Sequence, residues 1–446
     1  MSRRGVWVLV GAVVMCLIAA IAARSGSAGS RATSVWIDKG MDVVGGPVAA
    51  NGRVLVLVRE PNKATWLEAI DPATGRVRWR YRWSFSEITA GVITPPVAHD
   101  GIALLLAPAP KNNGLVKLEG IRVSTGRVAW HGTSAAYVTD APTSCPKPTG
   151  AAGFCLTFAL QNGAAGLIAL TPRTGRVLAV VPHIARGIST DAGIYQAATK
   201  TPMLVNVQIP SGILWAKNVT EIYGAHRDPD YGWDVEQYGS VDAGTIAHRD
   251  RPTSRALGGD VTVGFADATG ARLWSLPGLF QCGGAQDVRA PFSCQLTGSV
   301  VFSKTSGLPV PSKDATLTLV GFDPATGKTT WHQKVTNIAE LIQGNAAFVD
   351  DHRLVVDVGG ARKLLDFKDG QLAAATTGYW CSHDNTFTIS PPKGVTPQRV
   401  GSNRYTPCDK DKRPASGSAS STSAVGVTIG QTFVYASPTA LVAVKS

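Results

Sequence analysis

Four carboxyl groups lie close together in the middle of this 446-residue chain, at alternate positions around a glycine. They belong to Asp228, Asp230, Asp234 and Glu236. Calcium takes oxygen ligands from loops with this kind of spacing, so the stretch predicts a calcium site. The match to an EF-hand loop is partial, because the closing glutamate is missing, and a solvated loop is the alternative interpretation.

Aromatic side chains are interleaved with these carboxyl groups. Tyr231, Trp233 and Tyr238 fall within or directly after the acidic stretch. Tyrosine and tryptophan are enriched in protein interfaces, because they combine a large apolar surface with a polar tip. We therefore expect the same stretch to contact a partner protein.

The rest of the sequence shows no spacing typical of catalytic machinery. The eight histidines are dispersed without an H-E-x-x-H pair, and Ser211, although next to glycine, lacks the G-x-S-x-G context. His383 and Asp384 are adjacent between two cysteines, in what we expect to be a loop. The sequence thus predicts no catalytic residues, no enzymatic activity and no cofactor apart from the candidate calcium ion.

Six cysteines follow the N-terminal segment and fall into three local pairs. The pairs are Cys145 with Cys155, Cys282 with Cys294, and Cys381 with Cys408. An even, clustered set in an exported chain indicates disulfides that staple loops, and nearest-neighbour pairing is the simplest of the possible connectivities. A zinc site is the alternative, but the C-x-x-C spacing typical of such sites does not occur.

The N-terminal segment predicts export. Arg3 and Arg4 precede an uncharged run from Gly5 to Ala23, which ends at Arg24. A helix of this length spans roughly 28 Å, close to the hydrocarbon thickness of a membrane. The basic start places the N-terminus in the cytoplasm and the bulk of the chain outside.

We interpret residues 1–24 as an uncleaved signal anchor and residues 25–33 as a linker. A cleaved signal peptide is the alternative, because Ala20-Ile21-Ala22 has the small-x-small pattern of a cleavage site. In either case the long polar stretch 409–423 predicts a flexible loop. The chain would be a single-pass protein of the cell membrane, or a secreted one after cleavage.

The charge balance is basic, with 43 Lys+Arg against 31 Asp+Glu. The arginines are scattered, and the sequence has no dense basic stripe with interleaved aromatic residues, so we expect no nucleic-acid partner. Anionic lipid headgroups or cell-wall polymers fit a basic exported domain better, and a net charge that only keeps the protein soluble is the simpler interpretation. Glycine (48) and proline (27) are plentiful, which favours many turns over long helices.

An internal repeat is the strongest pattern in the chain. Asp71-Pro-Ala-Thr-Gly-Arg-Val-Arg-Trp79 and Asp323-Pro-Ala-Thr-Gly-Lys-Thr-Thr-Trp331 are nearly identical, and partial copies end at Trp130, Ala179 and Trp274. The glycines of the copies are Gly75, Gly126, Gly175, Gly270, Gly327 and Gly370. Most of these glycines are about 50 residues apart, but Gly175 and Gly270 are separated by 95 residues, about twice the repeat. We therefore expect a hidden copy between them, ending at Trp215.

Each residue of the motif has a structural role in a hairpin. The aspartate accepts hydrogen bonds from the backbone of the turn, proline presets φ, and glycine supplies a positive φ where the chain reverses. Alternating apolar residues such as those from Val54 to Val58 predict the flanking strands. The tryptophan lies on the returning strand, where it can fill the gap to a neighbouring unit.

Units of about 50 residues with four strands are typical of a β-propeller. The C-terminal residues 424–444 look like three strands of a unit, and Ser34–Asp38 could supply the fourth, which would join the first unit to the last. Six visible copies, the hidden copy and this composite unit predict eight blades over residues 34–446, with seven as the alternative.

These copies resemble the PQQ-like repeat family, in particular its BamB-like β-propellers. The resemblance implies an extracytoplasmic scaffold that presents loops to other proteins, and we expect a protein- or ligand-binding role. Quinoprotein dehydrogenases, which use PQQ and calcium, carry the same repeat, but this chain lacks their adjacent cysteine pair. Two alternatives remain: a quinoprotein-type oxidoreductase, and a sensor ectodomain that works through a membrane partner.

Overall fold

The computed structural model describes the chain between residues 34 and 445, in segments. These are residues 34–40, 42–60, 64–83, 96–108, 116–132, 137–138, 142–145, 153–159, 165–248, 254–256, 260–282, 290–303, 309–343, 347–350, 352–375, 379–388, 399–408, 426–437 and 440–445. The predicted anchor (1–24), linker (25–33) and flexible loop (409–423) lie outside the described residues. Within these segments, no helix is long and apolar enough to cross a membrane.

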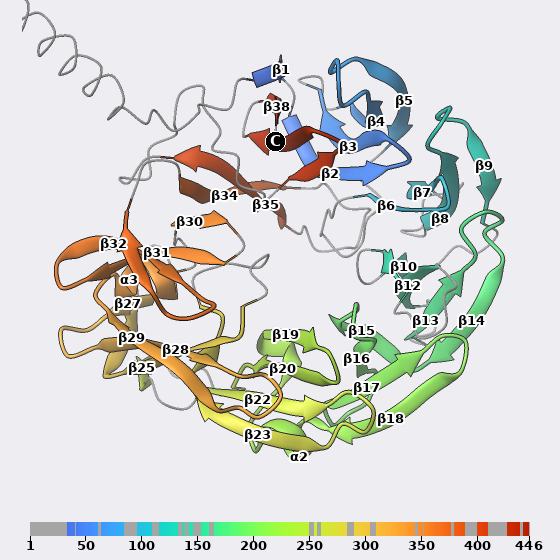
Figure 1. Ribbon diagram of the computed structural model, residues 1–446. Coiled ribbons are helices and arrows are strands. Elements are labelled where there is room, and N and C mark those ends of the chain that lie inside the picture. Colours follow the sequence, from blue (N-terminus) through green and yellow to red (C-terminus); the bar gives the residue numbers. More distant parts are fainter. Residues whose placement is uncertain are drawn as a thin grey trace, which may run out of the picture.

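The described residues form antiparallel β-sheets that stand side by side in a ring (Figure 1). Of nine sheets in this part of the chain, six have four strands, and the others have three, five and six. In the four-stranded meanders the first strand lies toward the centre of the ring and the last strand lies at the outside (Figure 1). This all-β arrangement is that of a β-propeller, as the sequence predicts.

Strands β2 to β18 form the first four sheets of the ring. Sheet β2–β5 contains β2 (Asp42–Ala50), β3 (Arg53–Arg59), β4 (Thr65–Ile70) and β5 (Val77–Trp83). Sheet β6–β9 contains β6 (Val97–His99), β7 (Ile102–Pro108), β8 (Val116–Arg122) and β9 (Val128–His131). Sheet β10–β14 contains β10 (Tyr137–Val138), β11 (Thr143–Ser144), β12 (Phe154–Ala159), β13 (Ala165–Leu170) and β14 (Val177–Pro182). Sheet β15–β18 contains β15 (Ile184–Ser189), β16 (Ile194–Ala197), β17 (Met203–Gln208) and β18 (Gly212–Asn218).

The next three sheets carry additional elements. Sheet β19–β23 contains β19 (Trp233–Tyr238), β20 (Val241–Ile246), β22 (Val261–Ala266) and β23 (Arg272–Pro277), preceded by helices α2 (Val219–Tyr223) and η2 (Pro229–Tyr231). Sheet β24–β29 contains β24 (Leu279–Phe280), β25 (Phe292–Thr297), β28 (Thr316–Phe322) and β29 (Thr329–Val335), followed by helix α3 (Ile338–Ile342). Sheet β30–β35 contains β30 (Ala347–Asp350), β31 (Arg353–Val358), β32 (Ala361–Asp366), β33 (Leu372–Ala374), β34 (Tyr379–Thr388) and β35 (Arg399–Cys408).

The ring is closed by a sheet made from both ends of the described chain. This closing sheet contains β36 (Val427–Ile429), β37 (Thr432–Ser437), β38 (Ala440–Lys445) and β1 (Ser34–Lys39). β1 pairs antiparallel with β38, from Ser34 opposite Val444 to Lys39 opposite Ala440. The outer strand of the closing sheet therefore comes from the start of the chain, as the sequence predicts.

The aspartate of the repeat holds the turn between the last two strands of a sheet. Asp71 Oδ1 accepts hydrogen bonds from the backbone N–H groups of Ala73 (3.0 Å) and Thr74 (3.2 Å). The N–H of Gly75 donates to the Asp71 carbonyl at 2.9 Å, with a φ of 70° at the glycine. Asp323 accepts the equivalent bond from the residue two positions on, at 2.9 Å. Local turn chemistry thus explains why the motif recurs.

A tryptophan on the outer strand of one sheet docks on the turn of the next sheet. Trp79 of β5 donates from Nε1 to the Val123 carbonyl at 2.7 Å, and a Cβ on Gly126 would lie only 2.6 Å from its ring. The indole is thus packed against the neighbouring backbone with its N–H satisfied. The same hydrogen bond joins Trp36 to Pro72, Trp130 to Pro172, Trp215 to Asp267, Trp274 to Pro324 and Trp331 to Phe367. The glycines beneath these rings are Gly75, Gly175, Gly270, Gly327 and Gly370.

The junction between β14 and β18 is built differently. β14 carries Ala179 where the other copies have tryptophan, and no atom lies within 4 Å of the place where a Cβ on Gly212 would be. Ala179 packs instead at the margin of an apolar cluster that includes Ile184 and Val207. This junction therefore depends on aliphatic contacts, without an indole hydrogen bond.

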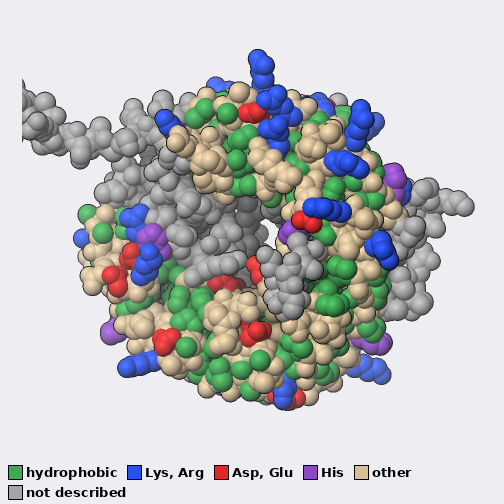
Figure 2. Space-filling view, turned by 45° about the vertical axis from the view of Figure 1, so that its right-hand side comes forward, with side chains coloured by type: hydrophobic (Ala, Val, Ile, Leu, Met, Phe, Trp, Pro, Cys, Tyr) green, Lys and Arg blue, Asp and Glu red, His purple; other side chains and the backbone are tan. Residues whose placement is uncertain are grey.

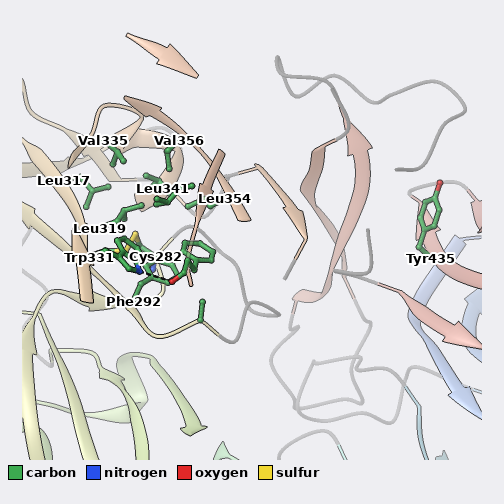
Figure 3. Packing of buried hydrophobic residues seen from close by; sticks show 14 of the residues in the cluster. Cys282, Phe292, Leu317, Leu319, Trp331, Val335, Leu341, Leu354, Val356 and Tyr435 are labelled. Atoms are coloured by element: carbon green, nitrogen blue, oxygen red, sulfur yellow. Dashed lines mark hydrogen bonds between the residues drawn. A yellow bond between two sulfur atoms is a disulfide. The ribbon is translucent and has the colours of Figure 1, made fainter. Parts of the chain in front are cut away.

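Apolar clusters between neighbouring sheets form the core. Figure 3 shows one of them, in which Leu317 and Leu319 of β28 and Trp331 of β29 lie near Leu354 and Val356 of β31. Burying each such side chain stabilises the fold by about 1.5–3 kcal/mol. Because the contacts run between sheets, a single sheet cannot bury its own apolar faces, and the ring is needed for stability.

Candidate functional site

The acidic stretch of the sequence does not form one loop. Asp228 precedes the short helix η2, while Asp234 and Glu236 lie on β19, the first strand of its sheet. The expectation of a solvated loop over these residues is therefore wrong at its C-terminal end. β19 pairs with β20 along its whole length, from Trp233 opposite Ile246 to Tyr238 opposite Val241.

Asp228 and Asp230 are used in internal contacts. Asp228 is buried, and its Oδ1 accepts a hydrogen bond from the backbone N–H of Asp230 at 2.9 Å. The Asp230 carboxylate forms an ion pair with Arg186 and accepts a hydrogen bond from Gln196 Nε2 at 3.1 Å. The two contacts of Asp230 join η2 to the preceding sheet. The carboxyl groups of Asp228 and Asp230 thus have hydrogen-bond partners within the protein and need no bound ligand to satisfy them.

Asp234 and Glu236 lie on one face of β19 in a poorly hydrated setting. Glu236 Oε2 accepts hydrogen bonds from the Tyr238 hydroxyl (2.9 Å) and from Gln281 Nε2 (3.2 Å). Burial, together with the nearby Glu236 charge, raises the pKa of Asp234 to about 7. Among the described residues, no group of three or more histidine, cysteine, aspartate or glutamate side chains could hold a metal ion. The structure does not bring the four predicted ligands together, and calcium binding stays a prediction.

The three predicted contact aromatics differ in their surroundings. Trp233 is partly exposed (36%), and the Arg186 guanidinium lies over its ring, 5.4 Å from the centroid. Tyr238 is half-buried and packs edge-on against Phe280. The Tyr231 side chain lies outside the described part. Of the two described side chains, Trp233 is the more accessible to a partner.

Two of the predicted cysteine pairs are disulfides. Cys145 is bonded to Cys155 within sheet β10–β14, and Cys282 is bonded to Cys294 beside β25. Cys381 and Cys408 lie on the paired strands β34 and β35, opposite Thr406 and Tyr379 respectively. The loop expected between them is therefore wrong, because most of it is a hairpin, and the third disulfide stays a prediction.

A buried pair of carboxyl groups was not found from the sequence. Asp242 of β20 is fully buried next to Asp267, whose Oδ1 accepts a hydrogen bond from Asn206 of the preceding sheet at 2.8 Å. No described N–H or O–H group donates to either oxygen of Asp242. Burial, together with Asp267, raises the pKa of Asp242 to about 8. The two carboxyl groups therefore share a proton near neutral pH.

Insertions break the repeat in one sector of the ring. β21 (Ser254–Ala256) lies between β20 and β22, and β26 (Ser299–Phe302) and β27 (Pro309–Pro311) lie between β25 and β28. These three strands pair with one another as an additional sheet, called the insert sheet below. Helix α3 is held on it by a hydrogen bond from Gln343 Nε2 to the Pro309 carbonyl at 2.9 Å. Segments from three places in the sequence thus meet at one end of sheet β24–β29.

These segments and sheet β24–β29 enclose a pocket of about 340 Å³, called the insert pocket below. This volume lies at the small end of the range for small-molecule sites. Most of its lining is apolar and includes the Cys282–Cys294 disulfide. The lining residues are Asp260, Pro277, Gly278, Leu279, Cys282, Cys294, Gln295, Leu296, Thr297, Val300, Pro309, Leu317 and Ile342. Leu317 and Cys282 are also labelled in Figure 3, as members of the same apolar cluster.

Among the described residues that line the insert pocket, one carries a charge. Asp260 Oδ1 lies 3.5 Å from Nη1 of Arg227, and the two side chains are 13% and 5% exposed. Arg227 also donates to the Ile246 carbonyl at 3.1 Å. The two charges offset each other, so the pocket wall is close to neutral while the carboxylate can still accept a hydrogen bond.

The insert between β25 and β28, which forms part of this pocket, could be recognised from the sequence. The glycines of the repeat at 270 and 327 are 57 residues apart, more than the usual unit, and this surplus corresponds to the insert between β25 and β28. Nothing in the sequence indicates that the insert meets β21 and α3, because those contacts are set by the ring.

The face shown in Figure 2 has an opening at its centre, with lysine and arginine side chains prominent at the top of the ring. Figure 1 places β1 to β5 in that region. Arg78 and Arg80 of β5 are exposed, and each is paired with a carboxylate, Asp71 and Glu68 respectively. The positive net charge is thus partly compensated locally.

The fold is that of a β-propeller, and part of the chain is similar to a known propeller family. Residues 15–227 match the family model described as outer membrane protein assembly factor BamB. The resemblance predicted from the sequence is confirmed over that part of the chain. No curated protein is similar to this chain at a significant level.

Solved structures with similar folds include BamB and several dehydrogenases. BamB from Moraxella catarrhalis is 13% identical, with 93% of this chain and 96% of that chain covered and a TM-score of 0.41. A europium-containing methanol dehydrogenase is 12% identical, with 84% and 86% covered and a TM-score of 0.43. Quinohemoprotein alcohol dehydrogenase from Comamonas testosteroni is 12% identical, with 80% and 72% covered and a TM-score of 0.38. Similarity at this level carries no argument about function.

Proposed function

We propose that this protein is a non-catalytic binding scaffold of the cell envelope, an eight-bladed propeller held at the membrane by residues 1–24. Eight blades follow if each sheet other than the insert sheet is one blade. The family match is to an assembly factor, which supports a protein-binding role. The two disulfides support an oxidising, extracytoplasmic compartment. In this proposal the protein carries no resident cofactor.

The observation that carries the proposal is the concentration of extra structure in one sector. The strands of the insert sheet interrupt the chain within sheets β19–β23 and β24–β29, and α3 follows the second of these. The hairpin β34–β35 extends the next sheet, β30–β35. Most of the other sheets keep to the four-stranded repeat. Because a propeller frame is shared by unrelated functions, function lies in what is added to it. The insert sheet also exposes Val301 (55%) and Val310 (45%), which are paired across β26 and β27.

A site-specific photocrosslinker at Val310 tests this assignment in cells. We expect one discrete adduct with an envelope protein, and none from the same crosslinker at Val77, which is exposed on β5 across the ring (37%). Crosslinking at neither position, or equally at both, would contradict a partner site on the insert sheet.

The chain offers a matched deletion for the same experiment. Thr297 of β25 lies opposite Thr316 of β28, so residues 298–315 can be replaced by an Asn-Gly turn that joins the two strands directly. We expect this excision variant to fold and to lose its partner, measured by co-purification with the partner identified from the adduct. Retention of the partner by the folded variant would move the binding site elsewhere on the ring.

A further inference from the structure

We infer that the insert pocket binds a neutral, mainly apolar small molecule with one N–H or O–H donor. The inference rests on the proposed binding role of this sector and names a ligand class for it. The pocket lies beneath the insert sheet, separate from the exposed pair Val301 and Val310. A small molecule can therefore occupy it independently of a protein partner.

The lining selects for an apolar ligand. Leu279, Leu296, Val300, Leu317 and Ile342 come from different elements and surround the same space. Transfer of apolar surface from water to such a lining is worth about 25 cal/mol per Å². A polar or strongly hydrated ligand would lose its water without replacement hydrogen bonds.

The charges select for a neutral ligand. Asp260 and Arg227 offset each other at 3.5 Å, so a ligand with a net charge of either sign would enter without a counter-charge. A carboxylate oxygen accepts more than one hydrogen bond, so Asp260 can take a donor from the ligand while it keeps Arg227. Gln295 and Thr297 also line the pocket and add polar groups to its described wall.

The edge of the insert sheet favours a small molecule over an extended peptide. β27 consists of Pro309, Val310 and Pro311, and it is an edge strand of the insert sheet. Proline has no backbone N–H, so this edge offers few donors for another strand. The pocket is therefore suited to a compact ligand.

The pocket is also prevented from collapsing. The Cys282–Cys294 disulfide forms part of its wall, and α3 is fixed to β27 through Gln343 and Pro309. The α3 region is tied to sheet β30–β35 by Arg362, which pairs with Glu340 at 3.2 Å. Walls held by covalent and polar links keep a preformed site, so little binding energy is lost to ordering it.

The test uses two fluorescent probes with the same aromatic skeleton. N-phenyl-1-naphthylamine is neutral with one N–H donor, whereas 1-anilinonaphthalene-8-sulfonate adds a negative charge. We expect the full-length chain to bind the neutral probe saturably at one site per chain, and the anionic probe roughly tenfold more weakly or worse, a difference of about 1.4 kcal/mol.

Variants locate the probe. Leu296→Trp on β25 and Ile342→Trp on α3 fill the space from different elements, and each should weaken binding of the neutral probe by roughly tenfold or more, about 1.4 kcal/mol. Leu273→Trp is the matched control, because Leu273 is exposed (50%) on β23 outside the pocket, and it should bind as the unmodified chain does. The excision variant lacking 298–315 removes the Val300 and Pro309 walls and should also lose the site.

Three results would overturn the inference: no saturable binding, equal affinity in the filling variants that retain the thermal unfolding midpoint, or tighter binding of the anionic probe. If a filling variant fails to fold, the other filling variant and the excision variant decide. Failure here leaves the partner crosslink at Val310 untouched, and failure of the crosslink leaves probe binding untouched, so the two proposals are tested separately.

Discussion

Asp242 is the residue whose burial has the clearest energetic consequence. Its carboxyl group is fully buried beside Asp267, and it can be satisfied only when one of the two holds a proton. The unfolded chain would release that proton near pH 3.8, whereas the pKa of Asp242 in the fold is about 8. The folded state binds more protons in between, so stability falls as pH rises through this window and levels off above it.

Asp242→Asn should flatten this dependence. The asparagine amide can donate to Asp267 at every pH, so we expect thermal unfolding midpoints that fall less between pH 5 and pH 8, with the variant more stable than the unmodified chain at pH 8. Asp260→Asn is the control, since Asp260 is paired with Arg227 and should not reproduce the flattening. The same slope in Asp242→Asn and the unmodified chain would show that another group holds the proton.

Two glycines of the repeat allow the cost of a strained backbone to be measured separately from the cost of a steric clash. Gly327 and Gly212 both have positive φ, 69° and 96°, but a Cβ on Gly327 would lie 2.6 Å from the Trp274 ring, while Gly212 faces open space. Alanine at position 212 should cost about 1 kcal/mol for the strained conformation. Alanine at 327 adds overpacking and should cost about 2–4 kcal/mol. Equilibrium urea unfolding measures both, and equal costs would contradict the packing contribution.

The features that depend on local chemistry could be predicted from the sequence, and those that depend on distant contacts could not. The roles of Asp71, Gly75 and Trp79 follow from neighbours within a few residues, and the sequence carries that information directly. The Asp242–Asp267 pair does not, because the two residues meet only once the register of β20 and β22 and the contact with Asn206 are set. The expectation of a solvated loop over the acidic stretch was wrong for the same reason. Asp230 pairs with Arg186, and Glu236 accepts a hydrogen bond from Gln281, and both partners come from other elements.

At the scale of elements, the tryptophan contact decides how firmly one sheet holds the next. Trp79 lies opposite Ala69 in its own sheet, and Ala179 lies opposite Ala169 in the same register. A tryptophan opposite an alanine is thus compatible with this strand pairing. At β14 the backbone has the same pairing, but position 179 is an alanine, so the tryptophan contact is missing.

Reciprocal substitutions test this explanation. Trp79→Ala should lower the free energy of unfolding by about 3 kcal/mol, the lower end of the range for large-to-small changes of aromatics, because Trp79 is only partly buried. Ala179→Trp should raise the unfolding midpoint by completing the contact with the turn at Gly212. Chemical denaturation of both variants measures the effects. A lower midpoint for Ala179→Trp would mean that the apolar cluster around Ile184 has no room for the ring.

The insert pocket shows the limit of prediction at this scale. Each contributing segment is visible in the sequence as an irregularity, above all the 57-residue spacing between Gly270 and Gly327. Their meeting point depends on the arrangement of sheets around the ring, which brings β21 beside β26. Strand pairing between insertions has no periodic signal, so the site appears only in three dimensions.

For the whole molecule, closure by β1 and β38 holds the ring together. Trp36 on β1 also docks on the turn of sheet β2–β5, through its hydrogen bond to the Pro72 carbonyl at 2.8 Å. Loss of β1 would expose the edge of β38 and remove this contact. Both the closing sheet and the first sheet would lose stability.

Truncation tests the closure. Removal of the chain through residue 39 should lower the thermal unfolding midpoint and broaden the transition, measured by calorimetry. Removal only through residue 33 is the control and should leave the unfolding transition of the ring unchanged, since β1 begins at Ser34. A sharp, unshifted transition in the longer deletion would show that the ring is stable as an open arc.

The pairing of Ser34 with Val444 also sets the order in which the sheets can form during synthesis. β1 stays unpaired during synthesis until β38 has been made, so an intermediate without β38 cannot complete the closing sheet. Contacts this distant in sequence form slowly, and the open edges of the waiting strands are prone to pair with other chains. Until β38 is made, the ring is therefore an open arc with unpaired edges, and the chain is most prone to aggregation in that interval.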